Sequence, residues 1–416
     1  MSGGSSGGDE RIRAQYEAYP YPQRDPKDEA RRLVTGSPSH PLEIDHYLFG
    51  GRRDWRQPFR ALVAGGGTGD GTIMLAQGMA DRGCPAEIVY LDMSVASRRI
   101  AEGRAVARGL RNIRFATGSL LGAAELGPFD YVDCCGVLHH LADPAVGLAA
   151  LVRALSPGGG IGLMLYGALG RTGVYPMQAL LRTLTTGLPD AEKLALARRT
   201  LKDMPASNWL ARNPHLADHL NSDAGLYDLL LHSRDRAYTV PDIYDLLESA
   251  GLRLVTFIEP LRYDPASYLR DPALRRRLAG LDPMQAAAAA ENLCGSLKNH
   301  ALYAVPKSRS GDTVARPDDS AVPVLRDADG PTLAKGLTPG AGLVADLGGV
   351  RTTFPLPRLA AAILARIDGR ATLDEIRRAL PSAPDRPAFR AEFDALYAVF
   401  NGLNRMLLRF PAAAPG

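Results

Sequence analysis

Short apolar runs alternate with longer helix-like segments between residues 59 and 167, and this alternation constrains the fold more than any other feature. Such a pattern is typical of a parallel sheet that helices cover on both faces. The predicted strands are FRALVAG, AEIVYLD, IRFATGS, FDYVDCCGVL and IGLMLYG. The helices predicted between them are GTIMLAQGMADRG, SVASRRIAEGRAVARGL and PAVGLAALVRALSP. The chain is therefore expected to have an α/β fold built on a mostly parallel sheet.

The alternation stops after the fifth strand, and the rest of the chain has a different pattern. Residues from about 171 to 235 and from about 265 to 297 are predicted helical insertions, and RLVTFIEP and HALYAVP are two further strands, which bring the sheet to seven. Residues 309–320 have the composition of a linker. Residues 321–416 are expected to form a small module with three amphipathic helices, PLPRLAAAILARI, ATLDEIRRAL and AFRAEFDALYAVFNGLNRMLL.

The N-terminal segment is expected to lie outside the folded core. Residues 1–10, MSGGSSGGDE, lack the apolar core of a signal peptide and are predicted to be a disordered leader. A helix is expected to begin near Asp9 and to end at YPYP, because a proline and the residue before it both disfavour helix. The sheet domain, with its two insertions, is therefore predicted to span residues 11–308.

The charge balance and the cysteines exclude several classes of protein. With 49 basic and 45 acidic residues the net charge is +4, which is too small to indicate a nucleic-acid groove. None of the four cysteines forms a CxxC pair, so a reduced, cytoplasmic compartment fits better than a disulfide framework. The sequence has no apolar run long enough to span a membrane. It also has no HExxH, Cys/His cluster or carboxylate pair at metal spacing, so no bound metal is expected.

The loop LVAGGGTGDGT, residues 62–72, joins the first predicted strand to the first helix and contains five glycines. A triphosphate-binding P-loop needs GxxxxGK followed by Ser or Thr, and Thr72 occupies the lysine position. The dinucleotide fingerprint GxGxxG fails because Asp70 or Thr72 occupies its last position. Glycines spaced by two instead let the backbone lie flat against a bulky ligand. A cationic or zwitterionic nucleoside suits a loop that holds Asp70 and no basic residue.

Asp92 ends the second predicted strand, at the edge of the sheet where the glycine loop lies. A carboxylate about 20 residues beyond such a loop can accept two hydrogen bonds from ribose hydroxyls. The alternative is that Asp92 or Ser94 caps the next helix. Because the glycine loop precedes it, ribose binding is the favoured interpretation.

These segments resemble class I S-adenosylmethionine-dependent methyltransferases over roughly residues 10–306. The similar segments are LVAGGGTGDG, VYLDMS, FATGSLL, FDYVDCCGVLHHLADP and LVRALSPGGGIGLMLYG. Near the start, QYEAYPYP is similar to a segment that precedes the glycine loop in a bacterial subgroup of that family. In the last module, DGRATLDEI with the later LNRMLLR looks like small winged-helix-type domains attached to modifying enzymes.

The resemblance implies a Rossmann-like fold with a seven-stranded, mostly parallel sheet and helical cap insertions. It also implies S-adenosyl-L-methionine as cofactor and S-adenosyl-L-homocysteine as product. The glycine loop would hold the methionine portion and the acid after the second strand would hold the ribose. The residues expected to bind the cofactor are Tyr16, Gly65, Gly66, Gly67, Thr68, Gly69, Asp70, Asp92, Met93, Ser119, Leu120, Gly136 and Val137.

Two positions depart from the pattern of the wider family. An acidic residue commonly stands two positions before the first glycine, where this chain has Val63. Asp70, a backbone carbonyl or a tyrosine is expected to hold the methionine amino group instead. An aspartate that binds the adenine amine commonly stands where this chain has Ser119, whose hydroxyl accepts that hydrogen bond less strongly.

Methyl transfer requires little catalytic machinery, because the sulfonium methyl is already activated and the enzyme mainly aligns the acceptor. A general base is needed only for a protonated acceptor. The candidate catalytic residues are Tyr21 of the YPYP segment and His139 and His140 after the fourth strand. The alternatives are a packed ring for the tyrosine and structural hydrogen bonds for the histidines.

The candidate acceptor site lies past the fifth strand and in the first helical insertion, the part that the sheet does not need. Arg171 and Arg236 could each bind a carboxylate or phosphate of the acceptor through two hydrogen bonds. The alternative is that they form ion pairs with Asp235 or Asp228. The candidate substrate-binding residues are Tyr166, Arg171, Tyr175, His232, Arg236 and Tyr238.

The predicted function is an S-adenosylmethionine-dependent methyltransferase that acts on a small molecule or on a peptide or protein side chain. A non-catalytic binding partner with the same fold is the first alternative, and Val63 and Ser119 would support it. An RNA methyltransferase is the second, and the small net charge counts against it. The C-terminal module is expected to recognise a partner or to mediate a homodimer.

Overall fold

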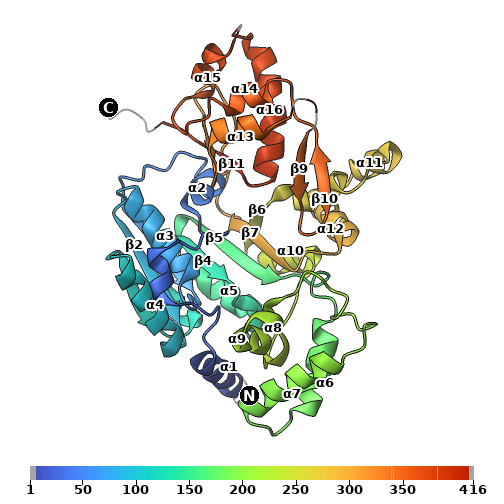
Figure 1. Ribbon diagram of the computed structural model, residues 1–416. Coiled ribbons are helices and arrows are strands. Elements are labelled where there is room, and N and C mark those ends of the chain that lie inside the picture. Colours follow the sequence, from blue (N-terminus) through green and yellow to red (C-terminus); the bar gives the residue numbers. More distant parts are fainter. Residues whose placement is uncertain (1–5, 339, 341, 382, 412–416) are drawn as a thin grey trace. The chain divides into compact units, whose positions relative to one another are not determined.

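The computed structural model describes residues 6–338, 340, 342–381 and 383–411 (Figure 1). It has two compact units. Unit 1 comprises the described residues up to Ser39, then Trp55–Arg253 and Gly295–Lys307. Unit 2 comprises His40–Asp54, Leu254–Cys294 and the described residues from Ser308 onward. The sequence places the second predicted insertion, residues 265–297, in the sheet domain, but most of it belongs to unit 2.

A seven-stranded sheet confirms the predicted α/β fold; its strand order is β3-β2-β1-β4-β5-β7-β6. Strands β1 to β5 pair in parallel, and β7 pairs antiparallel with β5. Strand β1 is buried at nearly every position, as expected for a strand covered on both faces. The strands are β1 (Phe59–Ala64), β2 (Ala86–Asp92), β3 (Ile113–Thr117), β4 (Phe129–Cys135), β5 (Leu155–Tyr166), β6 (Leu252–Phe257) and β7 (Asn299–Pro306).

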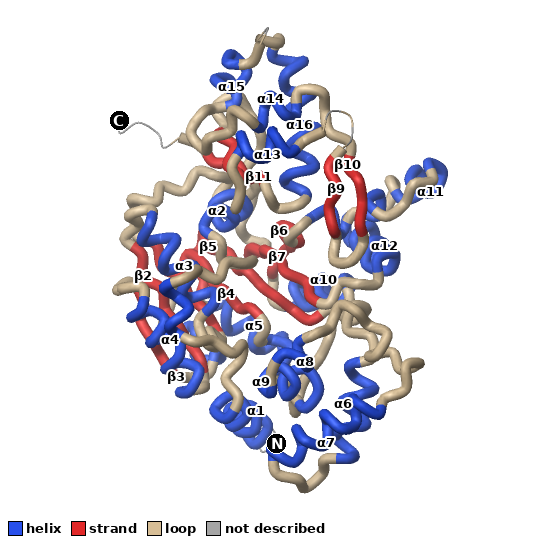
Figure 2. The backbone as a smooth tube through the Cα atoms, in the orientation of Figure 1, coloured by secondary structure: helices blue, strands red, loops and turns tan. Residues whose placement is uncertain are grey.

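Three of the four helices on the sheet begin at side chains that accept hydrogen bonds from the first turn, whereas α3 follows Gly69, which has none. Ser94 caps α4 and Asp143 caps α5, while Thr239 and Asp242 form a capping box on α10. These helices, which pack against the sheet in Figure 2, are α3 (Asp70–Asp81), α4 (Val95–Ala107), α5 (Pro144–Arg153) and α10 (Val240–Ser249). The helix predicted after the fourth strand, PAVGLAALVRALSP, ends at Pro157 in the prediction. This C-terminal end is wrong, because α5 ends at Arg153 and β5 begins at Leu155.

The N-terminal helix α1 spans Ser6–Ala18 and so begins inside the predicted leader. Residues 1–5 of that leader lie outside the described residues. The segment after α1 contains the 3₁₀ helix η1 (Pro26–Ala30), which Asp25 caps. Two further 3₁₀ helices follow strands at the same edge of the sheet, η3 (Leu120–Glu125) after β3 and η4 (Leu138–His140) after β4.

The first predicted insertion is helical and has an apolar core of its own. Val174, Met177, Leu181 and Leu226 are among its buried residues. Its helices are α6 (Val174–Leu184), α7 (Asp190–Asp203), α8 (Asp218–Asn221), α9 (Asp223–Leu226) and the π-helix η5 (Tyr227–Leu231). The insertion returns to the sheet through an isolated parallel bridge between Gly167 and Tyr238.

Unit 2 is built from three separate stretches of the chain. Its first two contribute α2 (Pro41–Glu43), the π-helix η2 (Ile44–Leu48), η6 (Pro260–Tyr263), η7 (Pro265–Ser267), α11 (Pro272–Leu278) and α12 (Pro283–Cys294). The third contributes β8 (Val322–Leu325), α13 (Gly330–Gly336), β9 (Leu343–Asp346), β10 (Arg351–Phe354), α14 (Ala360–Leu364), α15 (Leu373–Ala379), α16 (Arg386–Gly402) and β11 (Met406–Arg409).

The last stretch of unit 2 contains strands as well as the three predicted helices. Strands β9 and β10 pair antiparallel, and so do β8 and β11. The third predicted helix therefore ends at Gly402 rather than continuing through the sequence MLL. Asn404, in the left-handed region at φ 55°, turns the chain into β11. Among the described residues, no helix is long and apolar enough to cross a membrane.

Candidate functional site

A cavity of about 500 Å³ lies in unit 1 at the carboxyl ends of the parallel strands. Open α/β sheets bind their ligands at this edge. The far wall of the cavity comes from α1 and from the segment that runs on to Pro38. In the order in which the strands lie side by side, the edge contributes Ser119 after β3, Asp92 from β2, Gly65–Gly67 after β1, Gly136 after β4 and Tyr166 from β5.

The glycine loop is fixed both by positive φ angles and by close contacts within the chain. Gly65, Gly67 and Gly69 have φ of 74°, 49° and 102°, which other residues rarely adopt. A Cβ on Gly65 would lie 2.2 Å from a methyl of Val137, and one on Gly66 would lie 2.3 Å from an aromatic ring of β2. Glycine is therefore required here by the chain itself, and the bare backbone that results lines the cavity.

Asp92 both organises the glycine loop and faces the cavity. Its carboxylate accepts from the N–H groups of Gly67 and Ser94, each at 2.8 Å. Burial raises the pKa of Asp92, although these backbone donors oppose the shift. The side-chain cap of α4 comes from Ser94, which accepts from Ser97 N–H. Since a carboxylate offers about four acceptor positions, Asp92 can still receive ligand hydroxyls.

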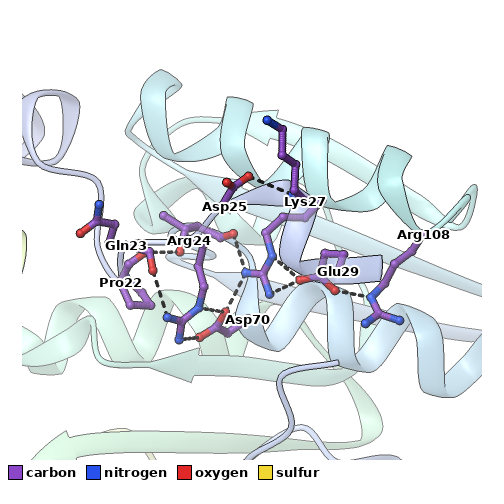
Figure 3. A network of polar contacts seen from close by, with 10 residues as sticks. Pro22, Gln23, Arg24, Asp25, Lys27, Glu29, Asp70 and Arg108 are labelled. Carbon is purple, nitrogen blue, oxygen red and sulfur yellow. Dashed lines mark hydrogen bonds and ion pairs between the residues drawn. The ribbon is translucent and has the colours of Figure 1, made fainter. Parts of the chain in front are cut away.

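Asp70, at the start of α3, is engaged by two arginines. Arg24 donates to its two oxygens at 2.9 and 2.6 Å, and Arg104 donates to Oδ1 at 2.7 Å (Figure 3). Burial alone would raise the pKa of Asp70, but these donors hold it below its usual range. A ligand ammonium at this carboxylate would meet two guanidinium groups, so the geometry opposes the expectation that Asp70 holds the methionine amino group.

Figure 3 shows that the same network continues to Glu29 and Arg108. Arg104 donates to Glu29 at 2.7 Å and to the carbonyl of Thr68 at 2.9 Å, while Arg108 pairs with the other Glu29 oxygen. The Arg104 and Glu29 side chains are only 1% and 3% exposed. This network ties the segment after α1 to the glycine loop and to α4, and no local pattern in the sequence predicts it.

Asp133, on β4, is a buried carboxyl that the sequence analysis missed. It is 2% exposed, lines the cavity, and is the register partner of Val63 on β1. The Ser39 hydroxyl donates to its Oδ2. Burial raises the pKa of Asp133 to about 8, although the backbone N–H of Cys135 lowers it. The available signal was an acid flanked on both sides by apolar residues in YVDCC, residues 131–135.

The β5 end of the cavity holds a group of buried and half-buried acid–base residues, here called the Asp228 cluster: Tyr16, His140, Tyr166, Asp228 and His232. Tyr16 and Tyr166 donate to opposite oxygens of Asp228, each at 3.0 Å. Burial raises the pKa of Asp228, and burial together with this carboxylate raises the pKa of both phenols. The rings of His140 and His232 stack with centroids 3.9 Å apart.

Three members of the cluster could in principle share a cation, which the expectation of no metal did not foresee. His140, Asp228 and His232 each offer one ligand atom, and these atoms lie within 4.8 Å of one another. However, His232 Nδ1 accepts from Arg234 N–H at 3.0 Å, so in the neutral ring Nε2 carries the hydrogen. That nitrogen lies 3.4 Å from the Tyr16 hydroxyl. A ligating histidine has the opposite arrangement, donating its second N–H to the protein. His140 has that arrangement, since its Nδ1 donates to the carbonyl of Arg234 at 2.9 Å, but His232 does not, so the cluster does not present three cation ligands in this hydrogen-bond pattern.

The candidate catalytic residues separate into two kinds. Tyr21 and His140 line the cavity. His139 is fully buried and stacks on Tyr166 with centroids 3.7 Å apart. Neither ring nitrogen of His139 has a hydrogen-bond partner among the described residues, and burial lowers its pKa well below the usual value. His139 is therefore a neutral ring that supports Tyr166 from outside the cavity.

Most candidate substrate-binding residues point to structural roles. Tyr166 lines the cavity. Arg171 pairs with Asp235 at 2.9 Å and lies 3.7 Å from the centroid of the Tyr166 ring, so the ion-pair alternative applies to it. Five of the six candidate substrate-binding residues are absent from the lining of the cavity: Arg171, Tyr175, His232, Arg236 and Tyr238. Arg236 lies over the ring of Tyr238 instead, and His232 belongs to the Asp228 cluster.

The candidate cofactor residues are gathered at the cavity with two exceptions. Thr68 is fully buried and donates to the carbonyl of Pro22 at 2.7 Å. Gly69 precedes α3, where a Cβ would lie 2.9 Å from Ala101. Both therefore position the loop from behind. Those that line the cavity are Tyr16, Gly65, Gly66, Gly67, Asp70, Asp92, Met93, Ser119, Leu120, Gly136 and Val137.

Comparison with known proteins gives one family and several relatives. Residues 62–161 match a family model described as a methyltransferase domain. An uncharacterized protein of Synechococcus sp. is 32% identical over 262 residues, 61% of each chain. The ubiquinone biosynthesis O-methyltransferase of Paracidovorax citrulli is 34% identical over 102 residues, 24% of this chain and 40% of that one. The tRNA 5-carboxymethoxyuridine methyltransferase of Escherichia coli is 30% identical over 158 residues, 37% and 58% of the two chains. The chain thus spans 40 to 61% of the lengths of these relatives.

Among solved structures, PKMT2 from Rickettsia typhi in complex with AdoHcy has a similar fold. The TM-score is 0.60 at 14% sequence identity, and the match covers 90% of this chain and 76% of that one. At this identity the likeness concerns the fold alone. The seven-stranded sheet therefore has the Rossmann-like fold of class I methyltransferases.

Proposed function

We propose that the chain is a class I S-adenosylmethionine-dependent methyltransferase whose cofactor and acceptor meet in the cavity of unit 1. The observation that carries this proposal is that the glycine loop, Asp92 and four members of the Asp228 cluster line one cavity at one edge of the sheet; the four are Tyr16, His140, Tyr166 and Asp228. One end of the cavity provides the backbone of the glycine loop and the carboxylate of Asp92, which would bind the ribose. The other end provides the side chains of the Asp228 cluster, which can exchange protons. The methyltransferase-domain match over residues 62–161 and the fold shared with the AdoHcy complex of PKMT2 support the same cofactor.

The residues that would hold the cofactor follow the strand order. Ser119 and Leu120, after β3, would border the adenine, and Asp92 would accept from the ribose hydroxyls. The backbone of Gly65–Gly67 would support the amino-acid portion. Tyr16 and Tyr21 line the cavity from outside the sheet, and we propose that this QYEAYPYP segment covers the bound cofactor and excludes water.

The Asp228 cluster supports an acceptor that arrives protonated. S-adenosylmethionine supplies an activated methyl, which the acceptor lone pair takes up while sulfur keeps the electrons of the broken bond. A hydroxyl or amine acceptor must also lose a proton. Asp228, whose pKa burial raises, can receive that proton directly or through the phenols of Tyr16 and Tyr166. We therefore propose methylation at oxygen or nitrogen.

Replacement of the proposed base tests this assignment. Asp228→Asn keeps the shape of the side chain but removes its basicity, so turnover is expected to fall about 10²- to 10⁴-fold. The affinity for S-adenosylhomocysteine is expected to stay unchanged, because Asp228 lies at the acceptor end. Label transfer from tritiated S-adenosylmethionine and calorimetry measure the two quantities. Full turnover in this variant would show that the proton is taken up elsewhere.

We propose a small molecule or a peptide side chain as the acceptor. The relatives named above act, by their names, in ubiquinone biosynthesis and on a tRNA uridine, so both classes need testing. The nearly balanced 49 basic and 45 acidic residues favour a small molecule or peptide over tRNA. Label transfer to phenols, carboxylic acids, peptides and total tRNA separates these classes. Labelled tRNA with a steep loss of activity in salt would establish the RNA alternative instead.

Unit 2 is proposed to bind a protein partner or a second copy of the chain, as the loose winged-helix resemblance of residues 321–416 suggests. Light scattering coupled to size-exclusion chromatography distinguishes these outcomes. A dimer of the purified chain would support self-association, and a monomer would leave recognition of another protein.

Binding of the cofactor is the first requirement of the proposed function. Calorimetric titration of the full chain with S-adenosylmethionine and S-adenosylhomocysteine is expected to give saturable binding of both. Gly67→Arg, which fills the loop, and Asp92→Ala, which removes the ribose carboxylate, are expected to lose most of that affinity. Asp203→Ala, at an exposed acid of α7, is the matched control. If the wild-type chain binds neither compound at millimolar concentration, the non-catalytic alternative replaces this proposal.

A further inference from the structure

Five carboxylates among the described residues line the cavity, and they differ in their partners. Four are already engaged: Asp9 and Asp70 pair with arginines, Asp92 holds the glycine loop, and Asp228 accepts from two phenols. Asp133 is the fifth. In the described part of the chain its donors are the Ser39 hydroxyl and the Cys135 N–H, and no ion pair reaches it.

A buried carboxyl without a counter-ion is energetically unfavourable, since burial removes hydration that an apolar residue would not need. Asp133 is 2% exposed, and its neighbour in register, Val63, is apolar. Two of its roughly four acceptor positions are taken by the donors named above. The side chain therefore has both the capacity and the electrostatic need for a cationic partner from the cavity.

The residue that holds Asp133 in place is itself strained. Ser39 is fully buried and has φ of 89°, in the left-handed region that its side chain disfavours. Its N–H donates to the Tyr303 hydroxyl at 3.2 Å, while its own hydroxyl donates to Asp133. Such strained residues persist where the surroundings fix them, and they gather at ligand sites.

We propose that Asp133 binds the amino group of the amino-acid portion of S-adenosylmethionine and S-adenosylhomocysteine. This assignment rests on the proposed function and adds the group that recognises the ligand's positive charge. Asp133 lies close to the start of α3: a Cβ on Gly71 would be 3.3 Å from its Oδ2 and 3.9 Å from Val63. The carboxyl thus faces the first turn of α3, which directly follows the glycine loop, and both line the same cavity.

Binding of an ammonium group also accounts for the acid in this position. In the free protein, burial keeps the proton on Asp133 up to about pH 8, where its pKa lies. An ammonium ion in contact with the carboxylate stabilises the ionised form, so the proton is released to solvent as the ligand binds. Asp70 would gain no comparable stabilisation from a ligand ammonium group, because Arg24 and Arg104 already neutralise its charge.

The test compares two probes, S-adenosylhomocysteine and 5′-methylthioadenosine, which lacks the amino-acid portion. Asp133→Asn keeps an acceptor for Ser39 and is expected to weaken S-adenosylhomocysteine binding about 10- to 100-fold. Its affinity for 5′-methylthioadenosine is expected to match that of the wild type. Equal weakening of both probes would mean that Asp133 only supports the structure of the cavity, which would overturn the proposal.

A relocated acid provides a second, independent readout. Asp133→Val alone is expected to lose affinity for S-adenosylhomocysteine. Combined with Val63→Asp, which returns a carboxylate about 4.8 Å away on the neighbouring strand, it is expected to regain at least part of that affinity. If Val63→Asp restores none of the affinity that Asp133→Val loses, a direct contact between Asp133 and the ligand amino group is contradicted. Circular dichroism shows whether Asp133→Val is folded. If it is not, the ratio of the affinities of Asp133→Asn for the two probes decides whether Asp133 binds the amino group.

The outcomes separate this inference from the proposed function. A wild-type chain that binds neither probe would overturn both. A wild-type chain that binds S-adenosylhomocysteine, together with an Asp133→Asn variant that keeps the wild-type ratio of probe affinities, would overturn the role of Asp133 alone.

Discussion

Asp133 affects the free protein as well as the bound state, because its carboxyl is buried without a counter-ion. Folding raises its pKa to about 8, compared with about 3.9 in an unfolded chain. The protonated form is thus favoured by folding, and the stabilisation that it provides is complete below the unfolded pKa and is lost as pH rises through about 8. The titratable groups around it are Cys134 and Cys135, and Tyr131 lies behind Ser39.

The pH dependence of stability is therefore expected to change in Asp133→Asn. Between about pH 5 and about pH 8.5 the variant should lose less free energy of unfolding than the wild type, because the amide has no proton to release. Asp92 and Asp228 also have raised pKa values, but both proteins contain them and their effects cancel. Urea denaturation at matched pH measures the difference, and parallel curves would contradict the buried, protonated state.

At the residue scale, the sequence could predict those site residues that lie within a recognisable motif or at a fixed distance from one along the chain. The loop glycines and Asp92 belong to this class, since strand, loop and strand end determine where they lie. Asp133 and Asp228 belong to another class, because their function depends on residues far away in the sequence. Asp228 meets Tyr16 from 212 residues away, and no local pattern encodes that contact.

At the scale of elements, the segment after α1 is locked to the glycine loop by a buried ion network. Glu29 receives both Arg104 and Arg108, and Arg104 also reaches Asp70 and the carbonyl of Thr68. Removal of one partner from a buried pair leaves the other charge uncompensated, which typically costs about 3 to 5 kcal/mol. The network therefore stabilises unit 1 and holds the wall of the cavity in place.

Glu29→Gln is expected to reduce the free energy of unfolding by about 3 kcal/mol or more. The control is Glu102→Gln, in the half-exposed pair that Glu102 forms with Arg98 within α4, which should cost less than about 1 kcal/mol. Urea denaturation measures both. Equal effects would mean that the Glu29 network contributes no more than a surface ion pair.

The elements themselves were largely predictable where the chain alternates, and less so elsewhere. The apolar runs of β1 to β5 and the capped helices between them have clear periodicity, so the sheet could be predicted. The end of the last predicted helix was wrong because the run MLL suits a buried strand as well as a helix, and its partner β8 lies about 80 residues earlier. Short strands such as β9 and β10 have too few residues for a pattern.

At the scale of the whole molecule, unit 2 depends on a stretch that lies early in the chain. His46 is fully buried, accepts from the backbone N–H of Leu408 at 2.9 Å, and lies 3.1 Å from the Tyr397 hydroxyl. Tyr47 donates to Asn404 at 3.2 Å. The linker composition of residues 309–320 suggested an independent module, but composition cannot reveal that residues 40–54 belong to the same unit.

Truncation after Lys307 tests this interleaving. The shortened chain would expose Ile44, Tyr47 and Leu48, which are buried in the full protein, and is expected to aggregate or to unfold at a lower temperature. Thermal unfolding and size-exclusion chromatography of both chains provide the comparison. A soluble, monodisperse truncated chain with wild-type stability would contradict the three-stretch description of unit 2.

The structure of the full chain with bound S-adenosylhomocysteine is the measurement that tests the central claim most directly. We predict that the ligand occupies the cavity at the carboxyl edge of the sheet, with its ribose at Asp92 and its amino group at Asp133. We further predict that its sulfur faces the Asp228 cluster. A ligand bound outside this cavity, or one whose ribose lies away from Asp92, would contradict the account.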